Sequence, residues 1–97
     1  MSAYMIIEVE VLDQETYGEY MERIPATVAQ YGGRYVIRSS QVAPLTGDWH
    51  PERLIAVEFP SMEQMTRWNA SPEYQALAPL RVQSTRTRAI AVEGYAG

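Results

Sequence analysis

"GGRYVIRSSQVAPLTGDWHPERLIAVEF" (residues 32–59) holds two strand-like runs, RYVIR and RLIAVEF, joined by a long loop. Both runs are rich in the β-branched and aromatic residues that favour strands, and the connection contains the Gly and Pro residues that interrupt them. Strands that follow one another in a chain usually pair. This stretch therefore predicts an antiparallel strand pair at the centre of the sequence, with the rest of the chain arranged around it.

The segment before this pair predicts a strand followed by a helix. Residues 3–11, AYMIIEVEV, alternate between two faces, as a half-buried strand does. Asp13 is placed to cap a helix that Gly32 and Gly33 end, and Pro25 is expected to bend that helix. The inward stripe of the helix is large and mostly aromatic: Tyr17, Tyr20, Met21, Ile24, Val28 and Tyr31.

The segment after the pair predicts two short helices and a last strand. Ser61 opens the first helix with a capping-box pattern, and Ser71 before Pro72 opens the second. Pro79 is expected to limit the second helix. Residues 87–95, TRAIAVEGY, alternate again and predict the fourth strand.

The element order is therefore β-α-β-β-α-β with an extra helical turn, in one domain over residues 1–97. This order predicts an α+β, ferredoxin-like sandwich, in which two main helices cover one face of a four-stranded antiparallel sheet. The alternation predicts that the helices cover Met5, Ile7, Val9, Ile55, Val57, Phe59, Ile90 and Val92. The open face would then carry Tyr4, Ile6, Glu8, Leu54, Ala56, Glu58, Ala89 and Ala91. This set is too apolar for bare solvent, so we expect a homodimer that pairs through the open faces as a dimeric α/β barrel around a pocket.

Composition excludes several classes of function. The chain has no Cys and no Lys among its 97 residues, which removes disulfides, thiolate nucleophiles and Schiff-base chemistry. A net charge of -4 argues against nucleic-acid binding. The sequence lacks a run of about 18 apolar residues that would span a membrane, and its N-terminal stretch lacks the basic flank of a secretion signal. We expect a cytoplasmic protein without nucleic-acid or membrane partners.

Three stretches carry a resemblance to a known family: YGGRY (31–35), the GDW-P-R loop (47–53) and the run from EFPS to SPEY (58–74). Together with the first and last strands, they resemble the family named domain of unknown function 1330 (DUF1330), in the dimeric α/β-barrel superfamily. The resemblance covers nearly the whole chain and implies a ferredoxin-like subunit that is usually paired. The wider superfamily includes cofactor-free oxygenases, lactone isomerases and haem-using enzymes, so the resemblance implies no single reaction.

The first candidate site lies on the open sheet face. If the register of the second and third strands places Arg38 and Glu58 opposite each other, they form an ion pair that could hold a carboxylate or an enolate, whereas a slip of one residue would send Arg38 to the helix side or to solvent. The favoured interpretation of such a pair is structural, because buried charges need partners merely to be tolerated. Glu8 beside Glu58 would raise one carboxyl pKa and create a general base, unless Glu8 lies at the solvated rim.

The second candidate is the loop of residues 39–52. His50 is a candidate catalytic group because its unperturbed pKa lies near neutral pH. Its neighbours Trp49 and Pro51 favour loop packing instead, and a lone histidine makes a poor metal site, so no metal is expected. We expect the loop to close one end of the barrel or to reach across the dimer, with Trp49 as its anchor and as a ligand contact.

The remaining candidates for ligand binding are Tyr4, Trp68, Tyr74 and Arg81. Tyr4 lies on the open sheet face, whereas Trp68 and Tyr74 flank the break between the two short helices. Arg81 would give a positive mouth for an acidic ligand, although a surface ion pair explains it equally well.

Two classes of function follow. In the first, a barrel pocket binds a small acidic or aromatic molecule and uses Arg38 and Glu58 for acid–base chemistry without a cofactor. In the second, the protein is a non-catalytic dimeric binding or structural module. Phosphate loops, nucleophile elbows and zinc spacings are absent from the sequence, so no cofactor is expected.

Overall fold

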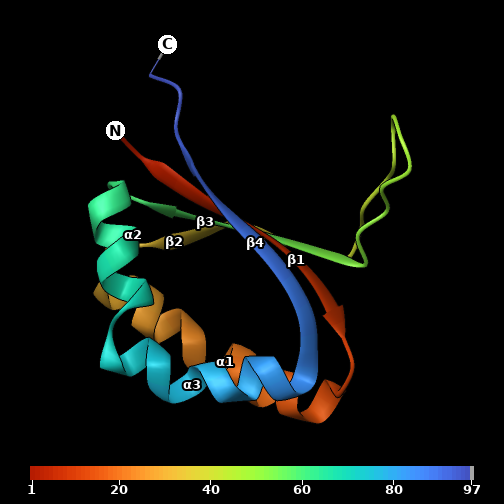
Figure 1. Cartoon of the computed structure of the whole chain (residues 1–97), viewed down its shortest axis with the longest axis horizontal. Coiled ribbons are helices and arrows are strands. Elements are labelled where there is room, and N and C mark those ends of the chain that lie inside the picture. Colours follow the sequence, from red (N-terminus) through yellow and green to blue (C-terminus); the bar gives the residue numbers. More distant parts are fainter. Residues whose placement is uncertain (97) are drawn as a thin grey trace.

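The computed structural model describes residues 1–96 and contains one four-stranded antiparallel sheet with three helices (Figure 1). The elements are β1 (Ala3–Val11), α1 (Gln14–Gln30), β2 (Arg34–Ser39), β3 (Arg53–Phe59), α2 (Met62–Asn69), α3 (Pro72–Ser84) and β4 (Thr85–Glu93). The strand order in the sheet is β2-β3-β1-β4, so the first strand pairs with both the third and the fourth. This is the predicted ferredoxin-like arrangement.

The helices begin at the residues that the sequence predicts. The Asp13 carboxylate accepts a hydrogen bond from the Thr16 N–H at 3.3 Å, and Ser61 and Ser71 cap α2 and α3 in the same manner. Pro79 does not limit α3, because the helix continues to Ser84. A proline removes only one backbone donor, and α3 packs along α1, so tertiary contacts outweigh that loss.

The core lies between the helices and one face of the sheet, and its most deeply buried large side chains are Ile24, Val28, Val57 and Phe59. The turn after α1 brings the chain back onto this core. Gly32 has a φ of 83°, and the Gly33 N–H donates to the Val28 carbonyl at 2.9 Å. Residue 33 is thereby pressed against the core with no room for a side chain.

A β-bulge interrupts the pairing of β2 with β3. Tyr35 lies opposite Val57 and Ile37 opposite Ala56, so Val36 is an extra residue between them. A bulge moves every later side chain of its strand to the other face of the sheet. Arg38 consequently lies opposite Ile55 on the helix-covered face, whereas a regular strand would have placed it on the open face.

The faces of β4 are the reverse of the prediction. Ile90 lies opposite Ile6, and Val92 lies opposite Tyr4, so both side chains belong to the open face. Both are exposed, Ile90 by 62%. The alternation of β4 was correctly predicted, but the two sets of residues were assigned to the wrong faces. One face of β4 carries Ile90 and Val92 and the other carries Ala89 and Ala91, and both sets are apolar, so the sequence does not distinguish them. The open face is therefore more apolar than expected.

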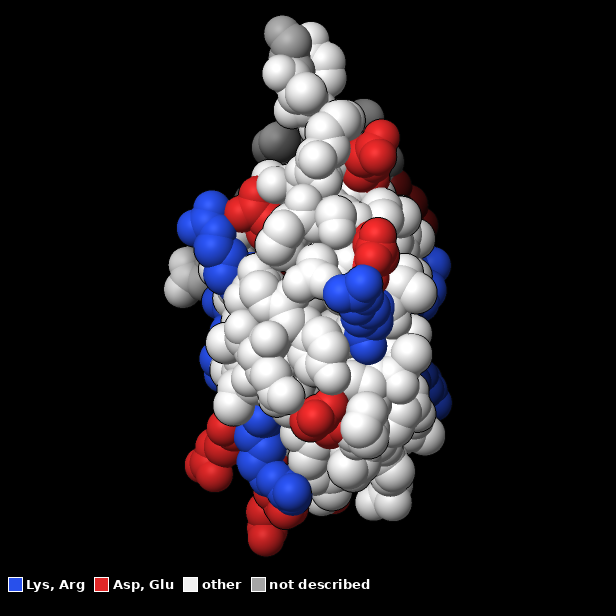
Figure 2. All heavy atoms as spheres, turned by 90° about the vertical axis from the view of Figure 1, so that its left-hand side faces the viewer, with Lys and Arg blue, Asp and Glu red and all other residues white. Residues whose placement is uncertain are grey.

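The loop between β2 and β3 projects away from the body of the molecule as a narrow arm (Figure 1). Leu45 in this arm is 95% exposed, and Trp49 is 54% exposed. On the face that Figure 2 shows, acidic and basic side chains are interspersed among uncharged ones rather than gathered by sign. Within residues 1–96, the helices are too short or too polar to cross a membrane.

Replacing Gly33 by Ala should lower the free energy of unfolding by about 1–3 kcal/mol. The added Cβ would lie 2.7 Å from Val28 Cγ1 and 2.8 Å from Phe59 Cε1, and both of these side chains are fully buried. Urea unfolding measures the loss. Gly18→Ala is the matched control, because its Cβ meets nothing within 4 Å in the middle of α1 and should add about 1 kcal/mol of stability. An unchanged Gly33→Ala midpoint would contradict the close packing of this turn.

Candidate functional site

Two carboxylates of the open sheet face, Glu8 and Glu58, have both oxygens engaged, whereas Glu10 on the same face makes one ion pair with Arg86 at 3.6 Å. Glu58 accepts hydrogen bonds from the Tyr4 hydroxyl at 2.8 Å and from Arg34 Nε at 2.8 Å. Glu8 accepts from Arg88 Nε at 2.7 Å and from the Trp49 indole at 3.2 Å. These groups satisfy one another within one subunit, which is typical of a structural network.

The predicted pair of Arg38 and Glu58 is wrong. The bulge at Val36 sends Arg38 to the opposite face of the sheet, and Arg34 takes its place beside Glu58. The predicted proximity of Glu8 and Glu58 is also wrong. Glu58 lies opposite Tyr4, four residues from Glu8 along β1, which separates the two by about 13 Å.

Glu58 is not arranged as a general base for neutral pH. The hydrogen bond from Tyr4, followed by that from Arg34, holds the pKa of the Glu58 carboxyl below its ordinary value. A base that works near neutral pH needs the opposite shift. Glu58 is therefore arranged as the acceptor of an ion pair and a phenol hydrogen bond.

The loop residues His50 and Trp49 lie at the edge of the open face. Trp49 borders a shallow depression of about 230 Å³ with Ile6, Leu54 and Ile90. His50 lines a wider groove of about 490 Å³ together with Glu8, Glu10, Glu52, Arg86 and Arg88. Within residues 1–96, no group of His, Asp and Glu side chains is arranged to hold a metal ion.

Trp68 and Tyr74 are core residues and not the rim of an entrance. Trp68 is 3% exposed, its indole donates to the Thr27 hydroxyl at 3.0 Å, and its ring lies 4.3 Å from that of Tyr74. Arg81 Nε donates to the Tyr74 hydroxyl at 3.3 Å. These three residues belong to the covered side of the sheet, away from Tyr4 and Glu58.

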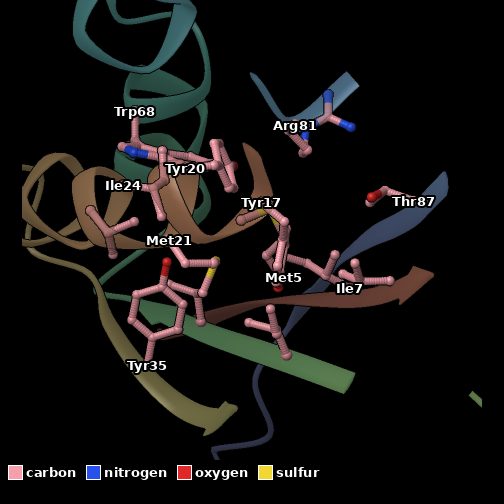
Figure 3. Close-up of a pocket in the computed structure, with 14 residues that line it drawn as sticks. Met5, Ile7, Tyr17, Tyr20, Met21, Ile24, Tyr35, Trp68, Arg81 and Thr87 are labelled. Atoms are coloured by element: carbon pink, nitrogen blue, oxygen red, sulfur yellow. The ribbon is translucent and has the colours of Figure 1, made fainter. Parts of the chain in front are cut away.

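A small cavity lies between the covered face of the sheet and the helices (Figure 3). Its volume is about 30 Å³, room for about two water molecules. Its walls combine aromatic and sulfur-containing side chains with one arginine and one threonine, beside aliphatic core residues: Tyr17, Tyr20, Tyr35, Trp68, Met5, Met21, Arg81 and Thr87. Within residues 1–96, no carboxylate and no imidazole lines it.

The tyrosines of the cavity are uncharged hydrogen-bonding groups at neutral pH. Burial raises the pKa of Tyr35 to about 12. Burial also raises the pKa of Tyr20 strongly, and that of Tyr17 against the opposing effect of the Arg53 and Arg38 charges. Each phenol therefore keeps its proton, so each can donate as well as accept.

Two buried polar atoms beside this cavity have no hydrogen-bond partner within residues 1–96. They are the hydroxyl of Tyr17, which lines the cavity, and Nε of Arg53. The two side chains are neighbours, because the Arg53 guanidinium lies 5.5 Å from the centre of the Tyr17 ring. Buried polar groups are nearly always hydrogen-bonded, and each exception calls for an explanation such as a bound water or ligand.

Sequence reasoning assigned Tyr17 and Tyr20 to the core and did not consider Tyr35 or Arg53 as site residues. The sequence did contain one sign of a pocket, the aromatic stripe of α1. Aliphatic side chains would fill a dry core at least as well as these tyrosines. The sequence could not indicate that Arg38 and Arg53 lie on the same face of the sheet, because their faces depend on the strand register and on the bulge.

Comparisons with known proteins agree with this fold. A model of the family described as "Domain of unknown function (DUF1330)" matches residues 2–95. Among curated proteins, none matches the chain.

Solved structures match over nearly the whole chain, at identities that show the fold alone. A protein of unknown function from Rhodopseudomonas palustris is 18% identical with a TM-score of 0.82, over 99% of this chain and 84% of that one. A dimeric ferredoxin-like protein of unknown function from Jannaschia sp. CCS1 is 11% identical, with a TM-score of 0.75, over 97% and 100%. SnoaB, a cofactor-independent oxygenase from Streptomyces nogalater, is 11% identical, with a TM-score of 0.73, over 99% and 95%.

Replacing Tyr4 by Phe should raise the pKa of the Glu58 carboxyl toward its ordinary value of 4.5, because the Tyr4 hydrogen bond is the main cause that lowers it. A lowered folded-state pKa stabilises the protein above the ordinary pKa, and this contribution disappears as the pH falls through the folded-state value. The stability difference between wild type and variant should therefore be full above pH 4.5 and shrink below it.

Carboxyl titration by NMR measures the pKa, and urea unfolding across pH measures the stability difference. Glu73, whose carboxylate accepts from Tyr31 and not from Tyr4, is the internal control and should titrate unchanged. An unshifted Glu58 in the variant would contradict the hydrogen bond.

Proposed function

We propose that this chain, which belongs to the DUF1330 family, binds a small aromatic molecule in the tyrosine-lined cavity of each subunit and works as a homodimer. The observation that carries the binding proposal is the pair of partnerless buried atoms, the Tyr17 hydroxyl and Arg53 Nε, beside a cavity in the core. Both atoms are donors, so a ligand with an acceptor group would satisfy them. The proposal moves the pocket from the open face, where the sequence suggested it, to the covered face.

The cavity must widen to take more than water. Met5 and Met21 lie in its walls, and methionine is the core side chain best able to change conformation, because it is unbranched and has several rotatable bonds. A planar ring would then lie among Tyr17, Tyr20 and Tyr35, which offer aromatic faces for stacking and phenolic hydrogen bonds for orientation.

Binding is supported better than acid–base catalysis. The cavity lining within residues 1–96 offers phenols with raised pKa values and a guanidinium, but no carboxylate or imidazole to accept a proton near neutral pH. The carboxylates of the open face lie on the other side of the sheet. SnoaB is similar to this chain in fold at 11% identity, and a shared fold alone does not imply that this chain has oxygenase activity.

The dimer is supported by the open face. Ile37, Ile90 and Val92 are exposed there beside internally paired charges, and the arm that carries Leu45 and Trp49 is exposed as well. An apolar face of this kind suits a self-complementary contact with a second copy. The dimeric ferredoxin-like proteins of similar fold, from Jannaschia sp. CCS1 and Bacteroides fragilis, are consistent with this partner.

Small aromatic compounds should stabilise the protein, by about 2.7 kcal/mol for a compound at a hundred times its Kd. Tyr17→Phe should weaken this effect while leaving the free protein as stable as wild type or more so, because the variant loses an unsatisfied buried hydroxyl. Thermal and urea unfolding with and without phenol, benzamide and benzoate measure both quantities. Tyr31→Phe, which loses a hydrogen bond to Glu73 outside the cavity, is the control that should leave ligand stabilisation intact. The cavity proposal fails if no compound of this panel acts, or if Tyr17→Phe binds as the wild type does.

Ile90→Arg should raise the dimer dissociation constant at least tenfold, because it places a charge in the centre of the proposed apolar contact. Trp49→Ala should also weaken the dimer, by about 1 kcal/mol or more if the indole is an interface anchor. Sedimentation equilibrium measures both constants. Val82→Arg is the matched control, because Val82 is equally exposed, at 64%, but lies on α3. Equal dissociation constants for Ile90→Arg and Val82→Arg would exclude pairing through the open face.

A further inference from the structure

The arginines of this chain divide into two groups. Five make ion pairs with glutamates, and all five lie on helix surfaces or the open face and sheet edge: Arg23, Arg34, Arg67, Arg86 and Arg88. Within residues 1–96, Arg38, Arg53 and Arg81 make no ion pair. The chain has a net charge of -4 and therefore more carboxylates than arginines, so enough carboxylates are present to pair with every arginine.

Two of the three unpaired arginines are neighbours on the covered face. Arg38 lies opposite Ile55, and Arg53 is two residues from Ile55 along the same strand, so the two form a diagonal pair. Diagonal positions on paired strands lie roughly 7–8 Å apart, within reach of one another for long side chains. Two like charges at this distance repel unless an anion lies between them.

Arg38 and Arg53 each lie beside a tyrosine of the cavity wall. The Arg53 guanidinium lies 5.5 Å from the centre of the Tyr17 ring, and the Arg38 guanidinium lies 5.8 Å from that of the Tyr35 ring. Tyr17 and Tyr35 both line the cavity. Arg53 is half-buried and Arg38 is exposed, so this side of the cavity wall reaches solvent.

The hydrogen-bonding groups at this position can all donate to the same acceptor. Arg53 Nε and the Tyr17 hydroxyl are buried without partners within residues 1–96, and Arg38 adds a second guanidinium. A planar oxyanion matches this set, because its two oxygens accept the parallel N–H bonds of a guanidinium and a further bond from a phenol.

We infer that Arg38, Arg53 and the Tyr17 hydroxyl form an anion site at the edge of the cavity and select ligands that carry a carboxylate on an aromatic ring. The ring enters the cavity among the tyrosines, and the carboxylate lies between the two guanidinium groups. This inference rests on the proposed binding function of the cavity and adds the charge of the ligand. It also accounts for a pair of cations on the covered face that makes no ion pair within residues 1–96.

Benzoate and benzamide are matched probes, because they have the same shape and differ in charge. NMR titration of the labelled protein with each should show shifts at Tyr17, Tyr20 and Tyr35, with benzoate binding at least tenfold more tightly. Added salt should weaken the binding of benzoate and leave that of benzamide unchanged.

Arg38→Gln and Arg53→Gln should each lower benzoate affinity about tenfold and leave benzamide affinity unchanged. Arg67→Gln on α2 is the control, because it removes a cation that is paired with Glu63 outside the cavity. The urea midpoint of Arg53→Gln should equal or exceed that of wild type, since no ion pair is lost. Arg53→Lys keeps the positive charge but loses the planar guanidinium that binds a carboxylate through two N–H groups, so it should recover only part of the benzoate affinity.

The outcomes separate the inference from the function it rests on. Equal binding of both probes, unchanged by Arg38→Gln and Arg53→Gln, would overturn the anion site and leave the cavity as a binding site for neutral molecules. If neither probe shifts the cavity resonances, the binding function itself fails, and the anion site with it. A folded Arg38→Gln that binds benzoate as tightly as wild type would also overturn the inference, since Arg38 is one of the two guanidinium groups of the proposed site.

Discussion

The sheet of this protein is covered by helices on one face only, and the other features follow from that constraint. On the open face, Glu8 and Glu58 are fully engaged by arginine, tyrosine and tryptophan donors of the same subunit. On the covered side, the Tyr17 hydroxyl and Arg53 Nε are buried without a hydrogen-bond partner within residues 1–96. Internally satisfied charges beside exposed Ile and Val are suited to a contact with another protein surface, whereas unsatisfied donors beside a cavity are suited to a ligand.

One extra residue in an edge strand controls which face receives each arginine. Arg34 lies before the bulge at Val36 and pairs with Glu58 on the open face. Arg38 lies after it and faces the helices. Without the bulge, Arg34 and Arg38 would both lie on the open face. Arg53 would then have no cationic neighbour from β2 on the covered face. Bulges are common where a side chain has to be redirected near a functional site, which agrees with the position of this one beside the cavity wall.

The core accepts a cost in stability around the cavity. Tyrosine is less well suited than leucine to fill a dry core, because its hydroxyl needs a partner when buried. Tyr17 lacks one, and Tyr20 and Tyr35 have raised pKa values because burial disfavours their ionised forms. The same core is closely packed at other points, where the Trp68 ring contacts both Phe59 and Tyr74 and Gly33 is pressed against Val28 and Phe59. The cavity is therefore a local gap bordered by closely packed side chains.

The sequence by itself determined the order of the elements, the residues that cap the helices, the turn at Gly32 and Gly33, and the family. Each of these depends on local preferences or on a periodic pattern within one segment. Only the tertiary structure decided the faces of Arg38, Ile90 and Val92, the partner of Glu58, and the cavity beside Tyr17. The physical reason is that a strand has a period of two residues, so one bulge or one step in register exchanges its faces, and pairing energies between separate segments choose that register.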